Sequence, residues 1–230
     1  VYYYNRDLNI LDRVSSGGLY GEVVYSPSRD KFFFNADNLD SGSQYRLFEY
    51  DKNSHQILQR TEGRISNRES IVHFSKDNHL YFGDYTTRRK LHRYSEGIYE
   101  YAFGYTATNN ESSLISAIKE VNGCLWWANR TPSRVKLLTA CDTSAFYQAT
   151  DINGSGVNDY VSGIWGYGSD VMVNATDSSG DYRLYRLVKS GTTYTATQIS
   201  NKNPSGDNVV EAKEYNGKFY FILDEELLVY

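Results

Sequence analysis

The stretch from Asp151 to Asp159 places oxygen-bearing side chains at alternating positions of a short polar segment. Asp151, Asn153 and Ser155 stand at positions 1, 3 and 5, and Asp159 stands at position 9. Calcium takes about six to eight oxygen ligands, and alternating donors on a tight turn can surround it. The segment therefore predicts a calcium site. The open alternative is a polar turn between two sheets, closed by its own side-chain hydrogen bonds.

A second group of residues follows or ends the short aromatic strands of the chain. Acids and arginines in such positions can bind polar groups of a ligand, and aromatic rings can stack on sugars. The predicted ligand-binding residues are Asp37, Asp84, Tyr85, Arg88, Trp127, Arg130, Asp177 and Asp224. For Trp127, packing between sheets is the open alternative, because neighbouring residues of a strand point to opposite faces.

The sequence contains no recognisable catalytic motif. Glycosidases need two carboxylates about 5–10 Å apart, and no sequence context singles out such a pair. The four histidines include no closely spaced ligand pair, and no phosphate-binding or dinucleotide-binding glycine motif is present. These observations favour a protein that binds without catalysing.

The elements that must position these residues form a repeat of 45–48 residues. A polar turn, an aromatic or apolar strand and a polar exit recur, and a strand with a central leucine follows each time. The aromatic or apolar strands start at Phe32, Leu80, Leu125, Val171 and Phe219. The central leucines of the strands that follow them are Leu47, Leu91, Leu137, Leu184 and Leu227. A strand-based repeat of this length is typical of a propeller or a solenoid.

We therefore predict an all-β fold, a five-bladed β-propeller with four antiparallel strands in each blade, as a single domain over 1–230. The predicted blades are approximately 17–62, 63–108, 109–154, 155–201, and 202–230 completed by 1–16. Closure of the ring by the N-terminal strand would leave only short, protected edges. Both Val1–Tyr4 and Leu227–Tyr230 match the third strand of the repeat. One of these segments is therefore redundant, and the open interpretations are a connection and the cut ends of a longer chain.

The two cysteines fall opposite each other in this scheme. If the chain turns at Pro132 and Ser133, the flanking strands pair Cys124 with Cys141. Opposed Cα atoms of antiparallel strands lie about 4.5–5.5 Å apart, a distance that a disulfide accepts. A disulfide and two buried thiols are both open at this point. A disulfide would favour an oxidising compartment.

Composition excludes several classes of partner. The chain carries 24 basic and 28 acidic residues, a net charge of −4, which argues against a nucleic acid held by charge. No run of apolar residues is long enough for a membrane span, so we expect no membrane insertion. The start at Val1 suggests a processed chain or a part of a longer one.

The repeats resemble the blades of β-propeller proteins, with strands such as Tyr182–Arg186 similar to those of kelch-like and TolB-like propellers. The kelch double glycine and the Trp-Asp of WD40 blades are absent. The segment 151–159 resembles the calcium loops of FG-GAP repeats. It departs from them at Ser155, where the loop usually carries Asp. The resemblance implies a propeller fold with calcium as its cofactor.

The resulting functional hypothesis is a non-catalytic binding module that lies outside the cell, at the cell surface or in the periplasm. It would recognise a protein or a glycan through one loop face of the propeller. Two alternatives are open. One is a glycan-active hydrolase with carboxylates at the central channel, and the other is a structural domain of a larger assembly.

Overall fold

A computed structural model describes the chain over most of its strands and hairpin turns. The described residues are 2–5, 10–13, 23–37, 45–60, 71–83, 91–95, 98–101, 114–130, 135–141, 148–151, 157–177, 181–190, 193–199, 209, 211–223 and 226–230. The regular elements within these ranges are all β-strands, so the predicted all-β class is confirmed. In the same ranges, no helix is long and apolar enough to cross a membrane.

Four consecutive sheets contain four antiparallel strands each, paired in chain order. Sheet 1 consists of β3 (Val24–Ser26), β4 (Lys31–Asp37), β5 (Tyr45–Asp51) and β6 (Gln56–Gln59). Sheet 2 consists of β7 (Ile71–Phe74), β8 (His79–Gly83), β9 (Leu91–Ser95) and β10 (Ile98–Tyr101). Sheet 3 consists of β11 (Leu114–Val121), β12 (Cys124–Arg130), β13 (Val135–Ala140) and β14 (Gln148–Asp151). Sheet 4 consists of β15 (Val157–Tyr167), β16 (Asp170–Asp177), β17 (Tyr182–Ser190) and β18 (Thr193–Gln198).

The two ends of the chain form smaller sheets. Sheet 5 has three strands, β19 (Glu211–Tyr215), β20 (Lys218–Leu223) and β21 (Glu226–Val229). The N-terminal hairpin pairs β1 (Tyr2–Asn5) with β2 (Ile10–Arg13) and with no other described strand. The repeat read from the sequence therefore corresponds to one sheet per period.

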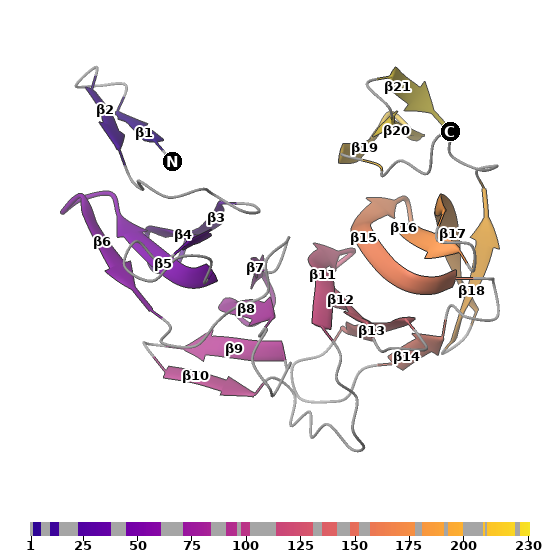
Figure 1. Cartoon of the computed structure of the whole chain (residues 1–230), viewed down its shortest axis with the longest axis horizontal. Helices are drawn as coiled ribbons and strands as arrows, with labels where there is room; N and C mark the ends of the chain where they lie inside the picture. The colour runs from indigo at the N-terminus through magenta and orange to yellow at the C-terminus, as the bar shows by residue number, and fades with distance from the viewer. Residues whose placement is uncertain are drawn as a thin grey trace.

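The sheets stand side by side around an arc, with the first strand of each sheet on the inside (Figure 1). β3 contacts β7, β7 contacts β11, β11 contacts β15, and β15 contacts β19. The fourth strands β10, β14 and β18 lie on the outside of the arc. This radial order is that of a β-propeller, and the predicted propeller fold is confirmed in this coarse form.

Tight hairpin turns join the first and second strands because their residues tolerate the left-handed backbone region. Asn122 and Gly123 have φ values of 52° and 66°, and Asn216 and Gly217 have 51° and 71°. Two successive positive φ angles define the type I′ turn, which matches the twist of the flanking strands and favours Asn-Gly. The strands are therefore set in register by their turns.

Aromatic and aliphatic side chains fill the seams between neighbouring sheets. Trp126 and Trp127 are adjacent on β12 and point to opposite faces, as strand alternation requires. Trp126 packs between sheets 3 and 4 with Tyr185 and Leu187, whereas Trp127 packs between sheets 2 and 3 with Phe74. Each buried aromatic side chain removes about 150–250 Å² of surface from water. Because the two rings lie on opposite faces of β12, this one strand stabilises two seams.

The described strands do not show the predicted closure of the last blade by residues 1–16. β21 pairs with β20 and so fills the third-strand position of sheet 5. β1 also matches a third strand in sequence, and one sheet has room for only one strand in that position. The N-terminal hairpin and sheet 5 accordingly lie at opposite ends of the arc (Figure 1). The predicted count of five blades is not confirmed.

Candidate functional site

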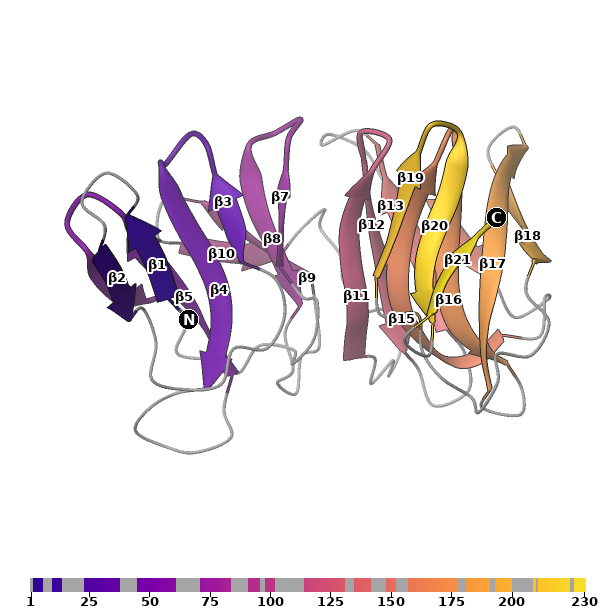
Figure 2. The ribbon, with the colours of Figure 1, turned by 90° about the horizontal axis from the view of Figure 1, so that it is seen from above.

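The strand directions divide the molecule into two ends. The turns between first and second strands lie at one end, which we call the turn face and define by residues 27–30, 75–78, 122–123, 168–169 and 216–217. Figure 2 shows these turns along the upper edge of the sheets. The second and fourth strands end at the opposite edge, where the first strands begin; we call this edge the loop face.

Five of the predicted site residues lie on described backbone at the loop face. Asp37, Arg130 and Asp177 are the last residues of the second strands β4, β12 and β16, and Asp151 is the last residue of β14. Asp159 lies near the start of β15. Antiparallel order therefore places the backbones of all five at the loop face. The other predicted site residues lie outside the described residues, namely Asp84, Tyr85, Arg88, Asn153, Ser155 and Asp224.

Two of these carboxylate residues lie on paired strands of sheet 4, β15 and β16. The Cα of Val157 is paired with that of Asp177, and Asp159 lies two residues further along β15. The pairing of β15 with β16 is irregular between Val157 and Val161 and again between Val161 and Gly163. Such bulges are common next to active sites, where they redirect a side chain.

A buried polar pair ties the two strands together beside this irregularity. The Nδ2 of Asn174 donates to the Oγ of Ser162 at 2.6 Å, and that hydroxyl lies 3.4 Å from the carbonyl oxygen of Asn174. Both side chains are buried, so this hydrogen bond replaces water that the groups lose on folding. Sequence reasoning missed this pair. The available signal was a polar residue in the middle of an apolar strand pattern.

Trp127 does not belong to the loop face. Its side chain is 1% exposed and packs with Val72, Phe74 and Leu125 in the seam between sheets 2 and 3. A ring enclosed on both sides has no face open to a sugar. The structure thus favours the core alternative for Trp127 over its predicted contact with a ligand.

The turn face is occupied by hydrogen bonds that join one sheet to the next. Glu120 of sheet 3 accepts from the backbone N–H of Ser75 in sheet 2 at 2.9 Å. Glu214 of sheet 5 accepts from the N–H of Gly168 in sheet 4 at 2.6 Å. Between sheets 3 and 4, the Nδ2 of Asn122 donates to the carbonyl of Gly168 at 3.0 Å. Polar groups at this end are therefore used inside the protein.

The first residue of the second strand also carries a link to the third strand. In sheet 3 this link is the disulfide between Cys124 and Cys141, with sulfur atoms 2.03 Å apart. Of the two open alternatives for these cysteines, the structure contains the cross-strand disulfide. In sheet 4 the guanidinium of Arg186 contacts the carboxylate of Asp170 at 2.5 Å.

In sheet 1 the corresponding link is ionic and largely buried. Lys31 contacts Glu49 at 2.5 Å and Arg60 contacts it at 2.7 Å. Burial opposes ionisation of this carboxyl, but the hydrogen bonds from Arg60 and Lys31 outweigh it and hold the pKa of Glu49 below its usual range. Glu49 is 3% exposed, so its two cations compensate for the loss of water.

No metal centre is formed by the side chains that the structure describes. Within the described ranges, no three His, Cys, Asp or Glu residues come together as a metal-binding group. The predicted calcium segment lies at 151–159, and only its ends belong to the described backbone. The calcium site therefore stays a prediction.

Comparison of the sequence with protein-family models and with curated proteins finds no match. Solved structures with a similar fold do exist. A gluconolactonase from Xanthomonas campestris has a TM-score of 0.59 at 10% identity, over 94% of this chain and 77% of that one. An oligogalacturonate lyase in complex with manganese has a TM-score of 0.60 at 12% identity, over 100% of this chain and 71% of that one. TolB from Acinetobacter baumannii has a TM-score of 0.56 at 11% identity, over 97% of this chain and 57% of that one.

These likenesses establish the β-propeller fold and correct one expectation. We expected a non-catalytic binding module, but two of the three similar structures are named as enzymes. The expectation that the chain only binds is therefore not supported by these comparisons. Function still has to be argued from the site, because one fold hosts many activities.

Proposed function

We propose that this β-propeller is an enzyme that acts on a carbohydrate-derived substrate at its loop face. The support from the comparisons is that two proteins of similar fold are named for sugar-derived substrates, a gluconolactone and an oligogalacturonate. The support from the chain itself is chemical. The loop face gathers acids and an arginine, whereas the turn face uses its polar groups in contacts between sheets.

The observation that carries the proposal is the pairing of Asp177 with Val157. Asp159 lies two residues further along β15, within the irregular stretch of that pairing. Carboxyl groups about 5–10 Å apart can serve as acid and base, or as acid and nucleophile, across a glycosidic bond. We assign Asp159 and Asp177 to these roles. Arg130 at the same edge is suited to bind a negatively charged group of the substrate, because guanidinium pairs well with carboxylate.

A divalent cation is a further part of this proposal. The oxygen donors of Asp151, Asn153, Ser155 and Asp159 fit a hard cation such as calcium, and one structure of similar fold contains manganese. A bound cation would polarise an oxygen of the substrate and keep Asp159 ionised. Asp177 would then be the carboxyl that donates a proton.

The proposal is tested with lactone, uronate and neutral glycan substrates on the purified protein. Replacement of either carboxylate, by Asp159→Asn or Asp177→Asn, should lower kcat/KM by about 10²–10⁴-fold, the usual contribution of a general acid or base. Asp170→Asn is the matched control, because Asp170 is the first residue of the same strand β16 but lies at the turn face. Equal activity in Asp177→Asn and Asp170→Asn would contradict the assignment.

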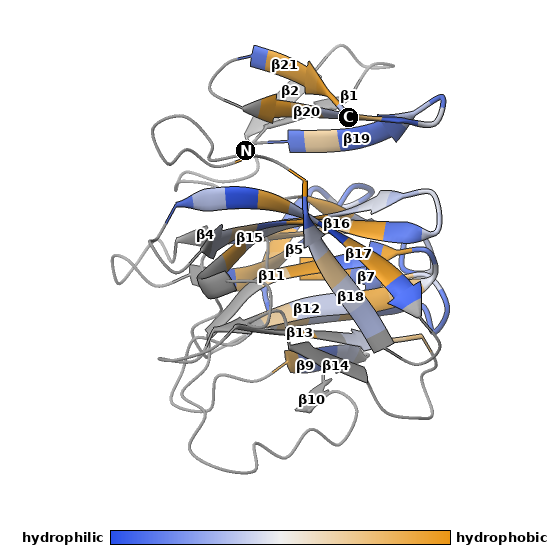
Figure 3. Ribbon diagram, turned by 90° about the vertical axis from the view of Figure 1, so that its right-hand side faces the viewer, coloured by the Kyte–Doolittle hydropathy of each residue, from blue (hydrophilic) through white to orange (hydrophobic). Residues whose placement is uncertain are grey.

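A second candidate function is a structural role in a larger assembly. Apolar residues are exposed on sheet 5, and Figure 3 shows hydrophobic residues along β20 and β21. The exposed side chains are Tyr215, Ile222, Leu227, Val229 and Tyr230, with Leu227 at 68%. Exposed apolar patches outside a pocket are typical of protein interfaces. Leu227→Lys should abolish any self-association measured by light scattering, and a monomer at all concentrations in the unchanged protein would count against this role.

We further propose that the protein functions outside the cytosol, either extracellularly, at the cell surface or in the periplasm. The disulfide between Cys124 and Cys141 supports this location, because structural disulfides persist in oxidising compartments. Mass spectrometry of the native protein without reductant should find both cysteines protected from alkylation. Two freely alkylated thiols in protein taken from its natural compartment would contradict the proposed location.

A further inference from the structure

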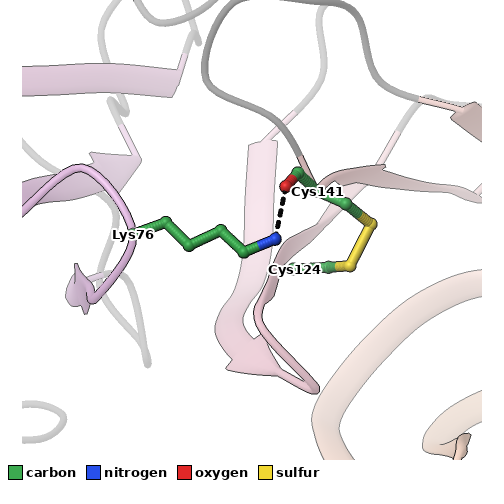
Figure 4. The surroundings of a disulfide bond; sticks show 3 residues. All are labelled: Lys76, Cys124 and Cys141. Atoms are coloured by element: carbon green, nitrogen blue, oxygen red, sulfur yellow. Dashed lines mark hydrogen bonds between the residues drawn. A yellow bond between two sulfur atoms is a disulfide. The ribbon is translucent and has the colours of Figure 1, made fainter.

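The disulfide lies beside the contact between two sheets. Cys141 follows the last residue of β13, and its carbonyl oxygen accepts a hydrogen bond from the Nζ of Lys76 at 2.7 Å. Lys76 belongs to the turn of sheet 2, whereas both cysteines belong to sheet 3 (Figure 4). The cross-link therefore fixes the position of a carbonyl that the neighbouring sheet uses.

A second contact holds the same turn from the other side. The carboxylate of Glu120 accepts hydrogen bonds from the backbone N–H and the hydroxyl of Ser75. A side chain at Gly123 would meet Lys76 Cε at 3.3 Å, so the lysine stem runs close to the hairpin that carries Cys124. The turn of sheet 2 is thus hydrogen-bonded to sheet 3 at two places, Glu120 and Cys141.

We propose that the Cys124–Cys141 disulfide is a redox-sensitive clamp on the seam between sheets 2 and 3. With the disulfide formed, Cys141 is held against β12 and its carbonyl stays in reach of Lys76. With the disulfide reduced, Cys141 loses its covalent anchor and Lys76 loses a fixed acceptor. Among the described residues, the hydrogen bonds from Ser75 to Glu120 are then the remaining polar contact between the turn of sheet 2 and sheet 3. This inference does not depend on the proposed enzymatic activity.

The chemistry of the switch needs an external dithiol. One thiolate of the dithiol attacks a sulfur of the disulfide, and its second thiol then resolves the mixed disulfide. The Cys124–Cys141 bond breaks and two thiols form, while the external dithiol is oxidised to its disulfide and supplies two electrons and two protons. Both cysteines are partly exposed, which allows this attack.

The molecule offers an internal control for the clamp. Gly168 in sheet 4 donates its N–H to Glu214 of sheet 5 in the same way that Ser75 donates to Glu120. The seam between sheets 4 and 5 carries no disulfide within the described residues. A specific effect of reduction should therefore change the contact of Ser75 and leave that of Gly168 unchanged.

The test is amide hydrogen exchange followed by NMR in the oxidised protein and in the protein reduced with a dithiol. Reduction should speed exchange of the Ser75 amide by about tenfold, the factor that corresponds to the loss of one hydrogen bond to a charged group. The Gly168 amide should change by less than about twofold. Reoxidation should restore the slow rate, which shows that the protein stays folded.

Lys76→Met separates the clamp from the general effect of a cross-link. In oxidised Lys76→Met, the Ser75 amide should already exchange at the fast rate, and reduction should add nothing further, because the two changes act on one contact. The proposal is overturned if reduction leaves the Ser75 amide unchanged in the natural sequence. It is also overturned if Ser75 and Gly168 respond equally, since the disulfide would then stabilise the whole fold without a local role.

Discussion

Gly163 allows the inner strand of sheet 4 to accommodate a tryptophan ring. A Cβ atom built at Gly163 would lie 2.0 Å from Cη2 and 2.4 Å from Cζ2 of Trp165, two residues further along on the same face of β15. The ring cannot easily move away, because Trp165 packs against Met172 and Phe219 in the seam between sheets 4 and 5. Gly163→Ala must therefore displace either the ring or the strand.

The expected cost of Gly163→Ala is about 2 kcal/mol, within the range of overpacking substitutions. For a chain of this size, that cost lowers the melting temperature by about 4–8 °C. The measurement is thermal unfolding followed by circular dichroism, together with the near-ultraviolet signal of the tryptophans. The signal of Trp165 should change in the folded state, since its ring is shifted.

Gly166→Ala is the matched control on the same strand. A Cβ atom there would meet Val121 Cγ1 at 3.3 Å, a contact that a small shift relieves. Both substitutions restrict the unfolded chain equally, so their difference isolates the clash with Trp165. In a Trp165→Leu background, Gly163→Ala should lose most of its cost. The reasoning is refuted if Gly163→Ala is no more destabilising than Gly166→Ala, or if its cost survives the removal of the indole.

Three further outcomes are expected. The pKa of Glu49 is held below its usual range, with Arg60 among the causes, so this pair stabilises the fold at neutral pH. The stabilisation is lost as the pH falls from about 4.3 through the folded-state pKa, and Glu49→Gln should flatten acid unfolding curves in that window. Arg186 contacts the hydroxyl of Tyr230, and Arg186→Met should speed limited proteolysis of the C-terminal strand by about two- to fivefold, the worth of an exposed contact; unchanged cleavage would exclude this role. If the segment 151–159 binds calcium, chelation should lower the melting temperature and Asp151→Ala should abolish that response; a melting temperature indifferent to chelation would remove the site.

The sequence predicts the sheets because their repeat survives in apolar positions. Leu80, Leu125 and Phe219 share one column of the repeat, and each is buried at 1% or less. The same periodicity places Cys124 opposite Cys141, and the structure joins them. Local pattern and register are thus sufficient where each strand pairs with its neighbour in the chain.

Contacts between sheets were missed because no single repeat contains them. Ser75 and Glu120 are 45 residues apart, and Gly168 and Glu214 are 46 apart. Both separations fall within the 45–48 residues of the repeat, since nearly equivalent positions of adjacent repeats become neighbours across a seam. An acid one or two positions before a turn, repeated in the same column, was the signal available. The strand that closes the ring could not be chosen from the sequence for a related reason, because β1 and β21 both match the third strand of the repeat.

Strand β16 shows why the two ends of the sheets are suited to different roles. At the turn face its first residue, Asp170, forms an ion pair with Arg186, so this carboxylate stabilises sheet 4. At the loop face its last residue, Asp177, lies across from the start of β15 at an irregular pairing. Short hairpins with internal partners resist rearrangement, whereas longer connections on a rigid scaffold tolerate variation and carry binding or catalytic residues. A substrate site is therefore expected at the loop face, and changes at the turn face should alter stability first.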